Sequence, residues 1–261
     1  MLYFSEANAK IETLGKVLGL VKGEKIYSLD LLSGYTCPGA KDCHSKVVLD
    51  AAGKRSVKDG RYTQFRCFSA SQEVLFPAVY KNRLRNWECI KACRGPSQVC
   101  DLILAGLPPK CKVLRYHVAG DFFKYTYLLG AVRAAEQRPD VLFYAYTKSL
   151  PFVHRLYLDG YDLSFLYKGV LLHNFLLTGS AGGKYDHLIK KLEIRTAKVV
   201  FSRDETAMPI DHDDSHAATV GGNFALLLHG TQPKGSDAAS AWQKIKKSEG
   251  GYSRKERGAR A

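Results

Sequence analysis

The stretch KVLRYHVAGDFFKYTYLLGAVRAAEQRPDVLFYAYT, at residues 112–147, decides the fold of this chain. It opens with a short and almost continuously apolar run over 112–118, which is typical of a parallel strand buried on both faces. Apolar residues at helical spacing follow over 122–137 and stop before Pro139, which predicts the end of a helix. A second apolar run over 141–147 completes a strand–helix–strand unit and favours parallel pairing of its two strands.

The same alternation continues toward the C-terminus. Further strand-like runs lie at 170–178, 197–202 and 224–230. The stretches around these runs predict helices at 149–160, 184–194 and 236–247, the last with Ser236 as its N-cap. Alternating strands and helices predict an α/β fold with a single domain and a mostly parallel sheet, built as an incomplete or distorted β/α barrel. An open, doubly wound sheet is the alternative.

The first 111 residues show a different pattern, with short strands expected at 25–31, 46–50 and 63–69. Helices are expected at 6–21, 71–94 and 97–107, with Pro77 near the start of the second helix or at a kink within it. We therefore divide a single domain, 1–249, into a cysteine-containing part, 1–111, and a repeating part, 112–249. The basic segment 250–261 is expected to be a flexible tail.

The composition of the 261 residues is that of an ordinary globular protein, with 46% hydrophobic and 25% charged residues. The formal net charge of +14 indicates a polyanionic partner, and nucleic acid is the candidate. No apolar run reaches about eighteen residues, so we expect no membrane span. The N-terminus lacks a basic region followed by an apolar one, so we expect no signal peptide and a cytoplasmic location.

Polar residues follow every strand-like run of the repeating part, and in parallel α/β folds such strand ends form the ligand site. The candidate catalytic residues after the first two runs are His117, Asp121 and Lys148. The glycine-rich segment after the third run is not a Walker A motif, because three residues rather than four separate its glycines. It is either a plain turn or a site for an anion or cofactor carboxylate, with Gly179, Ser180, Gly182 and Gly183 as the binding residues.

The cysteines suggest a metal site in the first part of the chain. Cys37 and Cys43 lie on a Pro/Gly turn, and Cys67 follows. Thiolates on tight turns can bind zinc or an iron–sulfur cluster, and His44 is a possible fourth ligand. The alternative is that two or three of them are ordinary buried or free thiols. Cys89 and Cys93 share a helical face, where helix packing is the simpler explanation.

The sequence IDHDDSHA, at 210–217, is the densest polar cluster and lies in a long loop. Its side chains could bind a divalent metal or transfer protons; the candidates are His212 as a metal ligand and Asp213, Asp214 and His216 as catalytic groups. The alternative is a solvated acidic loop.

Basic residues gather on the expected helix 71–94 and at the C-terminus, where they would suit a nucleic-acid backbone. A solvated helix face explains the first group equally well. The candidate nucleic-acid-binding residues are Arg83, Arg85, Lys246, Lys247, Arg254, Lys255 and Arg257.

Several long motifs resemble the phage and plasmid family called gene product 88, from about residue 30 to 252. They are GYTCPGAKDC, DGRYTQFRCFSASQE, YHVAGDFF, FYAYTKSLPF, GGKYDHLI, IDHDDSHA and FALLLHGTQPKGS. The resemblance implies a bacteriophage or mobile-element protein made in the bacterial cytoplasm, and it brings no established activity.

A weaker likeness extends to phage proteins with three-cysteine motifs, which are similar to radical S-adenosylmethionine (SAM) enzymes. The likeness implies a partial β/α barrel with a [4Fe–4S] cluster held by three cysteines near the first strand. In this chain Cys67 lies further along the sequence from Cys43 than the third cysteine of the three-cysteine motif does. Our leading hypothesis is an enzyme with a metal centre at Cys37, Cys43 and Cys67, which binds SAM near Gly179–Gly183 and acts on nucleic acid or a nucleotide.

Two other classes of function remain open. One is a nucleic-acid-binding protein without catalysis, containing structural zinc or no metal. The other is a divalent-metal nuclease or hydrolase that uses Asp211 together with the cluster at 212–216.

Overall fold

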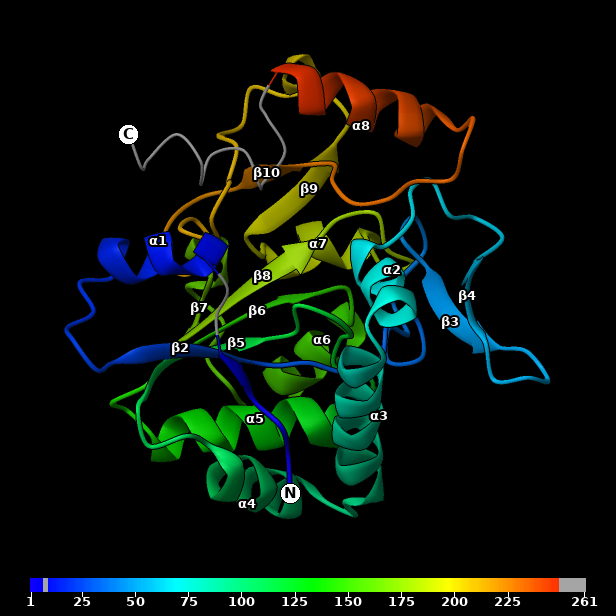
Figure 1. The fold of residues 1–261 in the computed structure, drawn as a ribbon. Coiled ribbons are helices and arrows are strands. Elements are labelled where there is room, and N and C mark those ends of the chain that lie inside the picture. Colours follow the sequence, from blue (N-terminus) through cyan, green and yellow to red (C-terminus); the bar gives the residue numbers. More distant parts are fainter. Residues whose placement is uncertain (7–8, 249–261) are drawn as a thin grey trace.

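The computed structural model describes residues 1–6 and 9–248, and its main feature is one eight-stranded sheet (Figure 1). The strands run in the order β1-β2-β5-β6-β8-β9-β10, and β7 pairs with β8. The path from β2 to β10 is parallel throughout, whereas β1 and β7 pair antiparallel. The bounds are β1 (Ser5–Glu6), β2 (Lys25–Leu29), β5 (Cys111–Tyr116), β6 (Leu142–Thr147), β7 (Val170–Leu172), β8 (Phe175–Ser180), β9 (Thr196–Val200) and β10 (Phe224–Leu227).

This sheet confirms the predicted α/β fold with a mostly parallel sheet. The parallel strands are neighbours in the sheet in the same order in which they follow one another along the chain. The described sheet stays open, with β1 and β10 at its edges, so the barrel is incomplete.

The two faces of the sheet pack against different elements, because successive side chains of a strand point to opposite faces. Leu114 and Phe143 belong to a large core shared with the helices after β2, β5 and β6. Val113 and Tyr144 belong to a smaller core on the other face, shared with α1 and the loop at 217–218. The helices are α1 (Ala9–Val17), α2 (Phe68–Leu75), α3 (Pro77–Ala92), α4 (Pro96–Gly106), α5 (Tyr125–Gln137), α6 (Leu150–Leu158), α7 (His187–Leu192) and α8 (Asp237–Ser248), with short 3-10 turns at Leu166–Lys168 and Arg203–Glu205.

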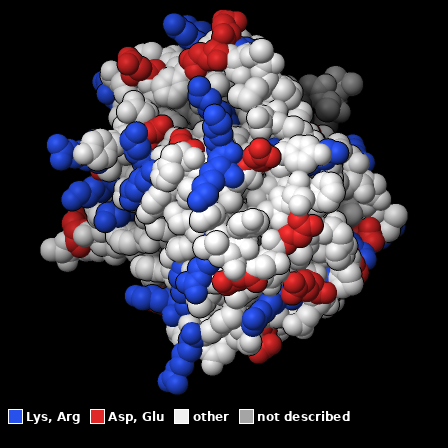
Figure 2. All heavy atoms as spheres, turned by 180° about the vertical axis from the view of Figure 1, so that it is seen from behind, with Lys and Arg blue, Asp and Glu red and all other residues white. Residues whose placement is uncertain are grey.

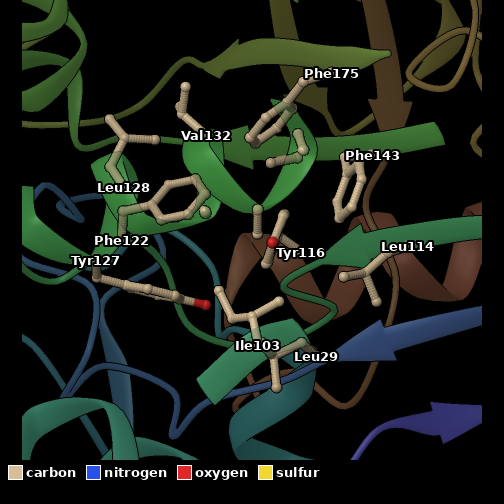
Figure 3. Packing of buried hydrophobic residues seen from close by; sticks show 14 of the residues in the cluster. Leu29, Ile103, Leu114, Tyr116, Phe122, Tyr127, Leu128, Val132, Phe143 and Phe175 are labelled. Carbon is tan, nitrogen blue, oxygen red and sulfur yellow. The ribbon is translucent and has the colours of Figure 1, made fainter. Parts of the chain in front are cut away.

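Aromatic rings fill the centre of the larger core (Figure 3). The Tyr116 ring lies 5.9 Å from that of Phe143 and 5.6 Å from that of Phe175, centroid to centroid. Each such side chain contributes about 1.5–3 kcal/mol through burial of its apolar surface. The three rings come from adjacent strands, so they also align β5, β6 and β8.

Two expected strands differ in the structure. The run 170–178 forms β7 and β8 of a hairpin, because Asn174 sits at the turn and its amide donates to the carbonyl groups of Ala135, Arg138 and Val141. The stretch 63–69 is not a strand. Residues 63–67 are irregular and lead into α2, which begins at Phe68 and has Cys67 as its N-cap residue.

A two-stranded sheet of β3 (Ser45–Leu49) and β4 (Arg55–Asp59) lies apart from the main sheet. The sequence did not predict β4, because RSVKD has no apolar run; only its pairing with β3 defines it. The expected helix 71–94 is two helices, α2 and α3, which separate at Phe76–Pro77 because proline has no N–H to continue the first helix. The predicted cap of α8 is confirmed, since the Ser236 hydroxyl accepts the N–H of Ala239 at 3.1 Å.

A buried charged network joins the end of β2 to α2 and α3. The fully buried carboxylate of Glu73 accepts the N–H and hydroxyl of Ser33 and one guanidinium N–H of Arg83 at 3.1 Å. A second guanidinium nitrogen of Arg83 lies 3.8 Å from Asp30, which accepts the N–H of Val118. Arg83 is therefore a structural residue, and its expected contact with nucleic acid is wrong because only 4% of it is exposed.

The other expected nucleic-acid contacts are placed differently. Arg85 and Lys247 are exposed, and Lys246 is half-buried beside the Trp242 ring. Arg254, Lys255 and Arg257 lie outside the described residues. Within residues 1–6 and 9–248, none of the helices has the length and apolar character that a bilayer span requires.

We predict that Arg83→Ala lowers the free energy of unfolding by about 3–5 kcal/mol, because the Glu73 carboxylate would stay buried without its cation. The exposed neighbour Arg85 is the matched control, and its replacement by alanine should change stability by less than about 0.5 kcal/mol. Urea denaturation followed by circular dichroism measures both. Equal stability of the two variants would contradict the structural role of Arg83.

Candidate functional site

The loops that leave the parallel strands meet at one edge of the sheet. The Asp121 carboxylate, after β5, accepts the hydroxyl of Thr147 at 2.7 Å and the N–H of Lys148 at 2.8 Å. The Lys148 ammonium, after β6, donates to the hydroxyl of Ser180 at 2.8 Å, at the end of β8. The loop after β2 joins them through the N–H of Asp42, which donates to the Gly182 carbonyl at 3.0 Å. The structure thus brings Asp121 and Lys148 together, as the strand pattern led us to expect.

The thiols of Cys37, Cys43 and Cys67 lie together at this edge. Burial raises the pKa of the Cys37 thiol well above its ordinary value, and the nearby charges of Asp121, Cys67 and Cys43 raise it further. Burial also raises the pKa of Cys43 to about 11, against the opposing charge of Lys148. Each of the three cysteine residues nevertheless keeps part of its surface exposed. The three thiols are therefore close enough for their charges to interact, although Cys67 is distant from the other two along the chain.

Cys67 differs from its two neighbours because it stands at the start of α2. Burial raises the pKa of its thiol, while the N–H groups of Ser69 and Ala70 in the first turn of the helix favour its thiolate.

The turn at 36–44, which carries Cys37 and Cys43, is called the thiol-bearing turn. Two glycines allow it to contact the loops after β5 and β6. A Cβ on Gly39 would lie 2.1 Å from the carbonyl oxygen of Lys148. A Cβ on Gly120, whose φ is +90°, would lie 2.6 Å from the Thr36 hydroxyl. Any side chain at either position would push the thiol-bearing turn away from the loops after β5 and β6.

The Asp121 carboxylate is the acidic group beside the thiols. Burial raises its pKa from 3.8 to about 6, although Thr147 and the N–H groups of Lys148 and Phe122 favour the charged form. Its protonation therefore changes close to neutral pH, which suits a proton-transfer role or a regulated charge next to Cys37.

His117 lies outside this cluster, in the larger core. Its Nε2 lies 2.9 Å from the Tyr127 hydroxyl, and its ring packs edge-on against Phe122. Burial lowers its pKa to about 3, so the imidazole is neutral at physiological pH. Its left-handed backbone, with φ of 69°, turns the chain at the end of β5.

The expected anion site at the glycine-rich segment already holds a carboxylate. The N–H groups of Gly182 and Gly183 each donate to Asp186 at 2.8 Å. Ser180 contacts the Lys148 ammonium through both its hydroxyl and its carbonyl. A cofactor carboxylate at these N–H groups would have to displace Asp186.

The acidic loop at 210–217 packs on the face of the sheet that α1 covers. The Asp214 carboxylate forms a buried ion pair with Arg115 of β5 and accepts the hydroxyl of Tyr144 at 3.1 Å. The Asp211 carboxylate accepts backbone N–H groups of the loop, including that of His216 at 3.2 Å. Two carboxylates of the loop therefore hold it in place.

Buried arginines that the sequence reasoning missed complete this arrangement. Arg195 is fully buried and donates to the carbonyl groups of His216 and Ala217 at 3.0 and 2.9 Å. Arg115 and Arg195 interrupt or precede apolar strand runs, and that interruption was the signal available in the sequence. His212 lies 3.0 Å from a guanidinium nitrogen of Arg203. Across the described part of the chain, no three His, Cys, Asp or Glu side chains are placed to share one metal ion.

Comparisons with known proteins relate this chain to a phage family. The family model described as gene product 88 matches residues 3–248. A curated relative, the Gene 88 protein of Mycobacterium phage L5, is 28% identical over 143 residues, which cover 51% of this chain and 52% of the relative. The chain thus spans about half the length of this relative. No solved structure matches the chain.

We predict that Asp121 makes the stability of the metal-free protein depend on pH. A carboxyl group whose pKa is raised in the folded state stabilises the fold below about pH 4 and loses that contribution as the pH rises through about 6. The free energy of unfolding of the wild type, relative to Asp121→Asn, should therefore fall by about 2.4 kcal/mol from pH 4 to pH 7. Urea titrations across this range measure the difference, and a constant or rising difference would contradict the shift.

A second prediction separates a structural from a hydrolytic role of the acidic loop. Asp214→Ala should lower the free energy of unfolding by about 3–5 kcal/mol, because Arg115 would stay buried without its partner. Asp213 is half-buried, and Asp213→Ala should cost less than about 1 kcal/mol. Thermal and urea denaturation of the two variants provide the test, and equal losses would show that the ion pair does not hold the loop.

Proposed function

This chain belongs to the gene product 88 family, and we propose that it is a phage-encoded iron–sulfur enzyme whose cluster is bound by Cys37, Cys43 and Cys67. We infer that it acts on nucleic acid or a nucleotide in the cytoplasm of the bacterial host. The observation that carries the proposal is the convergence of three thiols at the carboxyl edge of a parallel sheet.

The position of the thiols in the fold supports this proposal. β2 is the first of the parallel strands, and the turn with Cys37 and Cys43 follows it directly. The partial barrel of radical SAM enzymes likewise holds three cysteines near its first strand. Cys67 departs from that pattern in sequence, but the start of α2 brings it to the other two thiols.

The chemistry of the donor set also suits a cluster. Thiolates are the usual ligands of iron–sulfur clusters, and each cysteine binds a separate iron. The three sulfur atoms therefore need not converge on one point. The ligands of a single zinc ion, by contrast, must do so.

The protein groups around the thiols act through their charges. The high pKa values of Cys37 and Cys43 mean that these thiols are protonated in the metal-free chain and must lose protons on binding metal. The Lys148 ammonium favours the thiolate of Cys43 and is held by Ser180 and the Ala181 carbonyl. Asp121 adds a negative charge near Cys37 above its own pKa of about 6. When bound, a cluster with three cysteine ligands leaves one iron open to SAM and supplies one-electron chemistry.

The other two classes of function have weaker support. The Asp211 and Asp214 carboxylates of the acidic loop are engaged in structural contacts, which disfavours a hydrolytic centre there. The net charge of +14 is compatible with nucleic-acid binding both with and without catalysis.

We predict that protein purified without oxygen contains about four irons per chain, with equimolar acid-labile sulfide. Cys37→Ser, Cys43→Ser and Cys67→Ser should each lose most of this iron, because each removes one thiolate ligand. Iron and sulfide are measured by elemental and colorimetric analysis, and circular dichroism verifies that each variant is folded.

The matched control for this experiment is Cys93→Ser. Cys93 is a half-buried thiol at the end of α3, and its hydrogen donates to the Cys89 carbonyl at 3.4 Å. This variant should retain the wild-type iron content. Iron-free wild-type protein, or equal iron in all four variants, would overturn the proposal.

A further inference from the structure

A basic pocket lies beside the thiol-bearing turn. Its volume is about 430 Å³, and three separate segments line it. The lining residues are Ala40, Lys41 and His44 of the thiol-bearing turn, Gly60, Arg61 and Tyr62 after β4, and Gly183 and Lys184 after β8. Neither the acidic loop nor the basic helix face that the sequence singled out contributes to it.

The charges of this basic pocket have one sign. Lys41, Arg61 and Lys184 are exposed cations, and the lining includes no acidic side chain. The Lys184 ammonium is drawn toward the turn by the Pro38 carbonyl at 3.0 Å. Figure 2 shows that Lys and Arg are accompanied by Asp and Glu over much of the face that it draws. The pocket therefore concentrates positive charge where a single anionic group can enter.

Backbone contacts hold the three segments together without any ligand. The Gly60 N–H donates to the His44 carbonyl at 2.6 Å, and the Lys184 N–H donates to the Gly39 carbonyl at 2.8 Å. A bridge also pairs Ala40 with Gly183. The pocket is thus preformed, so binding would cost little conformational entropy in the backbone.

An aromatic ring stands at the same pocket. Tyr62 is 59% exposed, although burial of a tyrosine ring would be favourable. The Arg61 guanidinium lies 5.4 Å from the centre of this ring. Cations beside an exposed aromatic ring match a nucleotide unit, because the cations bind the phosphate and the ring stacks on a base.

We propose that this pocket binds the phosphodiester backbone of single-stranded nucleic acid, with one base stacked on Tyr62. A single strand fits better than a duplex, because stacking on Tyr62 needs a base face that pairing and stacking cover in a duplex. Ala40, Lys41 and His44 of the pocket belong to the turn that carries Cys37 and Cys43, so a strand bound there contacts this turn. This inference rests on the proposed function only for the role of the binding, which is to bring nucleic acid to the enzyme. The binding itself does not require an iron–sulfur cluster.

The test is fluorescence anisotropy of a labelled single-stranded oligonucleotide titrated with the full chain at several salt concentrations. The triple variant Lys41→Gln, Arg61→Gln and Lys184→Gln should bind at least about tenfold more weakly, with a salt slope reduced by about two. The control variant Lys16→Gln, Lys22→Gln and Lys110→Gln removes the same charge from exposed lysines elsewhere, and it should keep most of the affinity.

Two variants of Tyr62 separate stacking from phosphate binding, and removal of metal separates the cluster from it. Tyr62→Ala should weaken binding about tenfold, whereas Tyr62→Phe, which keeps the ring, should bind like the wild type. Wild-type protein stripped of metal by a chelator should bind the oligonucleotide as the untreated protein does. Equal affinity of the pocket and control triple variants, or tighter binding of a matched duplex, would overturn the inference. Iron-free wild-type protein that still binds through the pocket would contradict only the proposed function.

Discussion

Parallel hydrogen bonding from β2 to β10 obliges every loop that leaves these strands to begin at the same edge of the sheet. Because the strands also follow one another in chain order, each new loop is laid beside the preceding one. The contacts of Asp121 with Thr147, and of Lys148 with Ser180, are direct results of this order. The contacts among the loops that follow the strands are therefore a consequence of the strand order.

Buried charges then fix the parts that the parallel strands do not determine. On one side, Glu73 and Arg83 join α2 and α3 to the segment after β2, which carries the first two thiols. On the other face of the sheet, Arg115 and Asp214 hold the long loop between β9 and β10. Burying such charges costs desolvation energy, and their pairing offsets that cost only when both partners are present. The pairs are thus better understood as setting the positions of these segments than as adding stability.

Close backbone packing at Gly39 determines how near the loops lie to one another. Gly39 touches Lys148, and its neighbour Ala40 pairs with Gly183. One turn therefore carries Cys37 and Cys43 and also lines part of the basic pocket. This arrangement places the three thiols and the basic pocket within one assembly of loops.

The sequence by itself determined the order of the elements, because apolar periodicity and turn residues act locally. It predicted β5, α5 and β6, the cap of α8, and the turn that carries Cys37 and Cys43. It also indicated that the polar residues after the strands would meet. It could not predict β4, whose charged residues form a strand only by pairing with β3. Only the tertiary structure decided that Cys67 joins the other thiols, that Arg83 is buried, and that Asp214 pairs with Arg115. Each of these contacts joins residues far apart in the chain, and local patterns carry no information about the distance between them.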